Sequence, residues 1–136
     1  MKIYIGCDHA AYDEKEELKK YLTDFIDVED MGPFSDERCN YPTFASHVAR
    51  KVQKEGRGIL LCGSGIGVSM VANRFKGIRA ALCRTPKEAI LSRQHNDANI
   101  LCIGARVSSM DDIKAMVNAW VKEDFQEGRH AQRIHD

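Results

Sequence analysis

The feature that most constrains the fold of this sequence is a regular alternation of short apolar runs and longer amphipathic stretches. The apolar runs cover residues 3–5, 25–28, 59–62, 78–83 and 99–103. The amphipathic stretches predict helices over residues 12–22, 42–54, from about 65 onward, 86–94 and 111–125. This alternation predicts an α/β fold in which helices cover both faces of a parallel five-stranded sheet.

Length and charge bound the function classes. The chain has 136 residues, 43% of them hydrophobic, so we expect residues 1–136 to form a single domain. Twenty Lys and Arg residues balance twenty Asp and Glu residues, so no net field attracts the chain to nucleic acid or to an anionic membrane. No apolar run is long enough to cross a bilayer, and no secretory signal precedes the first strand-like run. We therefore expect a cytoplasmic protein that recognises a small ligand.

The cysteines are odd in number and widely spaced: Cys7, Cys39, Cys62, Cys83 and Cys102. Without a C-x-x-C pair they predict free thiols in a reducing compartment, not a disulfide framework or a zinc ribbon. Cys83 and Cys102 lie inside apolar runs and are expected in the core. The histidines lack a repeated ligand spacing, so we expect no metal site.

Ligands of open α/β sheets bind where the strands end, so the polar residues there are the candidates for a site. Asp8 and His9 follow the first run. They are either a hydrogen-bonding pair for a polyhydroxyl substrate or, in the case of Asp8, a cap of the first helix, and both roles are compatible. Arg106 follows the last run.

The turn Cys62-Gly63-Ser64-Gly65-Ile66-Gly67 carries the most chemical information. Its glycines let the backbone approach a ligand and aim amide N–H groups at an anion near a helix start. The spacing matches neither the dinucleotide fingerprint nor the P-loop. Amides and a helix start would stabilise a Cys62 thiolate able to act as a base, although a tight turn and a buried core cysteine would explain the same residues.

The stretch before the last strand has well-defined helix signals. Thr85 and Glu88 predict a reciprocal capping box, and Asn96 is expected in the left-handed position that ends the helix. His95 then lies at the helix end, where it is either an acid or base or a residue favoured by the helix dipole. Near the C-terminus, Arg129 and Arg133 share one face if their segment is helical, which suits a phosphate clamp or a solvated basic tail.

Six segments, in order and over essentially the whole chain, resemble the type B ribose-5-phosphate isomerases. They are Gly6-Cys7-Asp8-His9-Ala10, Arg38-x-x-Tyr41-Pro42, Cys62-Gly63-Ser64-Gly65-Ile66-Gly67, Asn73-x-x-x-Gly77-Ile78-Arg79-Ala80, Ser92-Arg93-Gln94-His95-Asn96-Asp97-x-Asn99 and Gly128-Arg129-His130-x-Gln132-Arg133. Galactose-6-phosphate isomerase subunits and other sugar-phosphate isomerases share this pattern, so the resemblance constrains the fold and the reaction type more tightly than the sugar.

The resemblance implies a Rossmann-like, flavodoxin-type three-layer sandwich, a homodimer or homotetramer with an active site lined by both subunits, and no metal or organic cofactor. Residue by residue, it implies that Cys62 is the catalytic base and that His95 opens the furanose ring. The substrate-binding residues that it implies are Asp8, His9, Tyr41, Gly63, Ser64, Gly65, Ile66, Gly67, Asn96 and the phosphate-binding Arg106, Arg129 and Arg133.

The function predicted from this resemblance is the interconversion of ribose 5-phosphate and ribulose 5-phosphate through an enediolate, in the pentose phosphate pathway. Some branches of the family use a glutamate in the glycine loop where this chain has Val68, Ser69 and Met70, so a cysteine-based mechanism is implied. The alternatives are an isomerase of a hexose 6-phosphate, of the allose or galactose type, and a non-catalytic sugar-phosphate-binding module.

Overall fold

The computed structural model describes residues 1–135. The strands are β1 (Lys2–Cys7), β2 (Asp27–Asp30), β3 (Arg57–Cys62), β4 (Ala80–Leu82) and β5 (Ile100–Gly104). The helices are α1 (Tyr12–Thr23), α2 (Tyr41–Val52), α3 (Ile66–Ala72), α4 (Pro86–Gln94), α5 (Met110–Lys122) and α6 (Arg129–His135), with a short 3-10 turn, η1 (His9–Ala11), before α1. No helix in this part of the chain is both long and apolar enough to span a membrane.

All strand pairings are parallel, and the strand order is β2-β1-β3-β5-β4. The predicted α/β sandwich around a five-stranded parallel sheet is confirmed. The last two strands are exchanged relative to the 2-1-3-4-5 order of flavodoxin. The chain runs outward from β1 to β2 and then returns to β3 on the other side, so the carboxyl ends of β1 and β3 flank a topological switch point.

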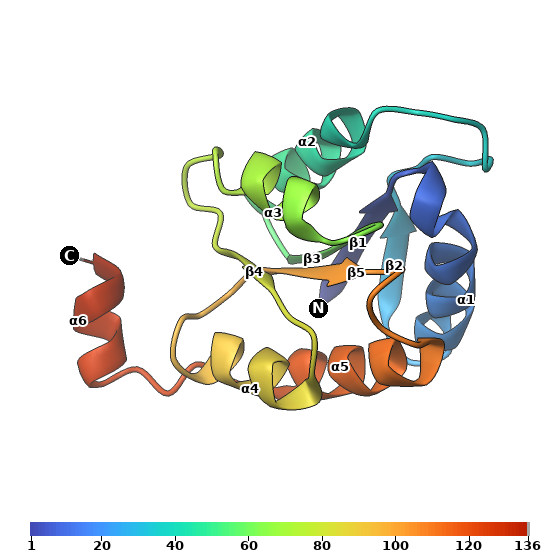
Figure 1. The fold of residues 1–136 in the computed structure, drawn as a ribbon. Helices are drawn as coiled ribbons and strands as arrows, with labels where there is room; N and C mark the ends of the chain where they lie inside the picture. The colour runs from blue at the N-terminus through green and yellow to red at the C-terminus, as the bar shows by residue number, and fades with distance from the viewer. Residues whose placement is uncertain (136) are drawn as a thin grey trace.

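Two helical layers cover the sheet, with α2 and α3 on one face and α1, α4 and α5 on the other (Figure 1). Successive side chains of a strand point to opposite faces of the sheet, so each strand contributes to both layers. In β3, Ile59 and Leu61 pack under α1 and α5, whereas Leu60 and Cys62 face α2 and α3. Every residue from 58 to 62 is buried, as expected for a central parallel strand.

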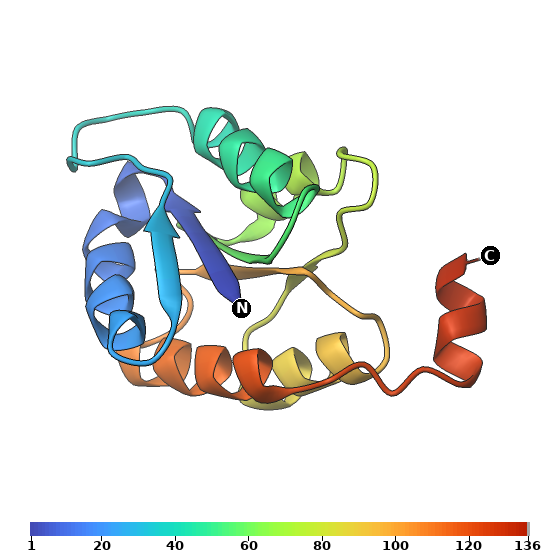
Figure 2. The ribbon, with the colours of Figure 1, turned by 180° about the vertical axis from the view of Figure 1, so that it is seen from behind.

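Helix α6 projects from one end of the layered body (Figures 1 and 2). An extended segment after α5 leads to it, and that segment is held against the end of α4 because Gln126 N–H donates to the Gln94 carbonyl at 3.0 Å. Arg129 and Arg133 both lie in α6, so the condition under which they share one face is met.

Several predicted boundaries were wrong for local reasons. Residues 25–28 do not all form a strand, because the amides of Phe25 and Ile26 bond back to Leu22 and close the last turn of α1. The residue with positive φ after α4 is Asp97, at 47°, and not Asn96. Helix α5 ends before Glu123, whose extended backbone accepts a hydrogen bond from Arg93.

Candidate active site

The first candidate site, which we call the cysteine cavity, opens at the carboxyl ends of β1 and β3. It has a volume of about 650 Å³. Its walls come from the β1 and β3 ends, the start of α2, the glycine turn and the loop after β5. The lining residues are Asp8, Tyr41, Cys62, Gly63, Ser64, Ile66, Gly67, Met70, Arg106 and Val107.

Cys62 is the last residue of β3 and is only 4% exposed. The N–H of Gly65 donates to its Sγ at 3.1 Å. Burial raises the pKa of Cys7 to about 12 and that of Cys83 to about 11. Cys62 is thus the buried thiol that faces a cavity and has an amide donor.

Two glycines of the turn are required by close packing. Gly65 has φ +80°, and a Cβ there would lie 2.6 Å from Leu82 Cδ1. A Cβ on Gly67 would lie 2.6 Å from Cζ of Tyr41. The turn therefore seats the tyrosine ring directly on the glycine backbone, which explains why Tyr41 lines the cavity.

Asp8 and His9 are placed by the 3-10 turn after β1. Asp8 is buried, and its Oδ1 accepts a hydrogen bond from Ala10 N–H at 3.0 Å, so it caps η1 while also lining the cavity. The capping interpretation of Asp8 is confirmed, and its role in substrate binding stays a prediction. His9 does not line the cavity; its Nδ1 lies 3.2 Å from both the N and the O of Cys39. His9 thus bonds to the loop that follows β2.

The second candidate site, which we call the histidine cavity, has a volume of about 240 Å³ and lies between α4, α6 and the start of β4. The imidazole rings of His95 and His130 stack with centroids 4.3 Å apart and planes 14° apart. Burial lowers the pKa of His130, and the neighbouring His95, Arg129 and Arg133 lower it further. The lining residues are Arg79, His95, Asn96, His130, Arg133 and Ile134.

The two cavities lie at opposite ends of the strands, the cysteine cavity at the carboxyl ends and the histidine cavity at the amino ends. Cys62 ends β3, whereas His95 and Asn96 precede β5. β5 has five residues, and at about 3.3 Å each they separate the two ends of the strand by roughly 16 Å. One copy of the chain therefore does not bring the predicted site residues together. Arg106 belongs to the cysteine cavity and Arg133 to the histidine cavity, while the exposed Arg129 lines neither.

Sequence reasoning missed five lining residues: Met70, Val107, Arg79, His130 and Ile134. The apolar ones carry no chemical signal, and their place depends on packing. Arg79 and His130 stand in two of the six segments that carry the family resemblance, but the sequence indicated no role for either residue. Within residues 1–135, no group of three or more His, Cys, Asp or Glu side chains is placed to hold a metal ion.

Known proteins resemble this chain in both sequence and structure. The family model described as Ribose/Galactose Isomerase matches residues 3–136. The ribose-5-phosphate isomerase B of Escherichia coli strain K12 is 45% identical over 137 residues, covering 98% of this chain and 91% of the relative. The Clostridium thermocellum ribose-5-phosphate isomerase B structure has a TM-score of 0.96 and 44% identity, covering 99% of this chain and 93% of that one. The Mycoplasma genitalium structure, with ribulose-5-phosphate bound, has a TM-score of 0.94 and 40% identity, over 98% and 91% of the two chains.

Proposed function

Because the chain belongs to the ribose/galactose isomerase family, we propose that it is an aldose–ketose isomerase that interconverts ribose 5-phosphate and ribulose 5-phosphate. The observation that carries the proposal is the Cys62 thiol, which faces a cavity at the sheet's switch point with the Gly65 N–H on its sulfur. The ligand of the Mycoplasma genitalium relative, ribulose-5-phosphate, supports the choice of a pentose. The free cysteines support a cytoplasmic location, and the continuous sheet supports a single domain over residues 1–136.

In the proposed reaction, His95 transfers the proton that opens the furanose ring. The Cys62 thiolate then removes the proton from C2 of the aldose, and the electrons of that C–H bond form the enediolate double bond. The O2 proton moves to O1, and the Cys62 thiol returns its proton to C1 to give the ketose. Within residues 63–67, the Gly65 N–H donates to Cys62 Sγ and the Ile66 N–H donates to Ser64 Oγ. The remaining amides of this turn face the developing negative oxygen, where loss of one donor costs about 3 kcal/mol of barrier.

The separation of the two cavities supports a homo-oligomer in which each active site is shared. We propose that the cysteine cavity of one subunit meets the histidine cavity of its partner. In a two-fold dimer the same two surfaces meet twice, so two complete sites form. Arg106 would then reach the phosphate from one side, and Arg133, with Arg129 at the start of α6, from the other. Dimer and tetramer both satisfy this arrangement.

The test is to incubate the purified protein, without added metal, with ribose 5-phosphate and to follow ribulose 5-phosphate. We expect turnover in the wild type and a loss of roughly 10²- to 10⁴-fold in Cys62→Ala, because the general base is removed. Cys83→Ala is the matched control, since that thiol is buried in the core. Undiminished activity of Cys62→Ala would mean that another group is the base.

The second candidate is isomerisation of a hexose 6-phosphate, which the family description itself favours by naming galactose as well as ribose. The same assay with allose 6-phosphate and galactose 6-phosphate separates the two. A higher kcat/KM for either hexose would replace the pentose assignment while leaving the chemistry at Cys62 unchanged.

A further inference from the structure

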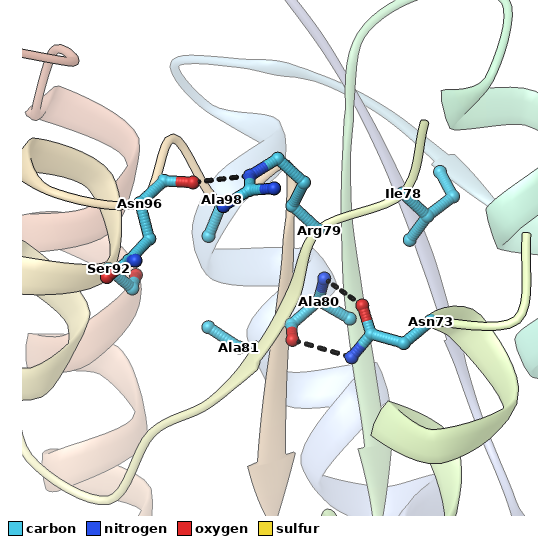
Figure 3. A pocket seen from close by; sticks show the side chains of 8 residues that line it. All are labelled: Asn73, Ile78, Arg79, Ala80, Ala81, Ser92, Asn96 and Ala98. Atoms are coloured by element: carbon cyan, nitrogen blue, oxygen red, sulfur yellow. Dashed lines mark hydrogen bonds between the residues drawn. The ribbon is translucent and has the colours of Figure 1, made fainter. Parts of the chain in front are cut away.

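Arg79, at the amino end of β4, is held on an unusually well-fixed backbone. The Asn99 side chain accepts from Arg79 N–H at 2.8 Å and donates to the Gly77 carbonyl at 2.9 Å. On the following residue, Asn73 accepts from Ala80 N–H at 2.8 Å and donates to the Ala80 carbonyl at 2.9 Å (Figure 3). Two side-chain amides therefore fix the strand start from which the Arg79 side chain extends.

The Arg79 side chain spans the boundary between two cavities. One is the histidine cavity, and the other is a neighbouring cavity of about 290 Å³ beside β4, to which both Arg79 and Asn96 contribute. The Arg79 Nε–H donates to the Asn96 carbonyl at 2.6 Å, the contact drawn in Figure 3. None of the ion pairs within residues 1–135 involves Arg79. Its best contact is thus with the backbone of the residue after His95.

The turn that Arg79 contacts is secured on its other side by Arg93. Arg93 is buried and donates to the Asp97 carboxylate and to the Ala98 carbonyl, both at 2.8 Å. The turn includes Asp97 in the left-handed region, a conformation that needs support from its surroundings. Arg93 holds the end of the turn, and Arg79 holds the part that carries His95 and Asn96.

We propose that Arg79 is a positioning residue: by bonding the Asn96 carbonyl it fixes the orientation in which His95 and Asn96 are presented to the substrate. The inference rests on the proposed function for its catalytic consequence, but the positioning itself is independent of activity. It assigns a role to a residue that touches neither Cys62 nor the glycine turn. A guanidinium suits this task because it is planar and always charged, and its Nε–H donates to the Asn96 carbonyl.

The first test uses Arg79→Ala and Arg79→Lys, with Arg50→Ala as the control for loss of an exposed arginine on α2. For Arg79→Ala we expect kcat to fall on the order of ten- to hundredfold, the cost of a small misplacement of catalytic groups. We expect the inhibition constant of inorganic phosphate to stay unchanged, because Arg133 remains. Lysine should restore part of kcat, and millimolar methylguanidinium should partly rescue Arg79→Ala.

The second test reads the geometry directly by NMR of the histidine side chains. The imidazole signals of His95 should shift and broaden in Arg79→Ala, while those of the exposed His47 on α2 should not move. Unchanged His95 signals, or weaker phosphate binding with unchanged kcat, would overturn the positioning role. A wild type without isomerase activity would contradict the proposed function only, because the His95 signals still report the effect of Arg79.

Discussion

At the scale of single residues, the decisive contrast is among the cysteine thiols. Cys7, Cys83 and Cys102 are buried, and burial raises the pKa of Cys7 to about 12, that of Cys83 to about 11 and that of Cys102 well above its ordinary value. These thiols stay protonated throughout the neutral range. Cys62 faces a cavity and receives an N–H, and Cys39 is partly exposed in a loop.

This contrast predicts selective alkylation of the folded protein. Iodoacetamide at about pH 7.5 should label Cys39 and Cys62 and leave Cys7, Cys83 and Cys102 unmodified, because only thiolates react and raised pKa values suppress them. Raising the pH to about 9 should not add the three core thiols, since their pKa values lie above it. Mass spectrometry of tryptic peptides measures the pattern, and ready labelling of Cys83 would contradict this account.

The sequence predicted the residue types of the cysteine cavity better than their contacts. Cys62, the glycines and Asp8 follow strand ends, and a parallel sheet brings such ends to one edge. The bond from His9 to Cys39 was not predictable, because it depends on the path of an irregular loop after β2. Asparagine favours the left-handed region, which is why the sequence predicts Asn96 there, but the left-handed residue is Asp97, whose carboxylate pairs with Arg93 four residues earlier.

At the scale of elements, the turn between β3 and α3 depends on Gly65 for both backbone and space. Gly65→Ala should lower the free energy of unfolding by about 3 kcal/mol, because left-handed strain adds to a Cβ contact of 2.6 Å with Leu82 and 2.9 Å with the Ile103 backbone. Gly77→Ala is the matched control: its φ is +82°, but nothing lies within 4 Å. The control should lose only about 1 kcal/mol in urea unfolding. Equal losses would show that space around Gly65 is irrelevant.

Docking of α6 should depend on pH through His130. Burial and neighbouring positive charge lower its pKa in the folded protein, so the undocked state binds protons more readily. Docking is then fully stable above the ordinary histidine pKa of about 6.5 and weakens as pH falls below it. The protection factors of the amides of residues 129–135, which are exchange rates corrected for the intrinsic pH dependence of amide exchange, should be lower at about pH 5 than at pH 7.5. His130→Asn should reduce this difference, and protection factors independent of pH in the wild type would contradict the prediction.

At the scale of the whole molecule, the alternation of apolar runs and amphipathic stretches was enough to predict the layers and the parallel sheet. It did not predict that β5 inserts between β3 and β4, because the run lengths do not specify strand order. Nor did it reveal that Cys62 lies at the carboxyl ends of the strands and His95 at the amino ends. A linear motif contains both residues without showing how far apart the fold places them.

The measurement that tests the shared site most directly is complementation between two inactive variants. Cys62→Ala and His95→Ala are each purified, mixed in equal amounts, and allowed to exchange subunits before the isomerase assay. In a mixed dimer one site carries both substitutions and the other carries neither, so random exchange should restore about a quarter of the wild-type activity. Each variant incubated alone is the control. If the mixture remains as inactive as its components while mass spectrometry shows mixed dimers, the site is not shared between subunits.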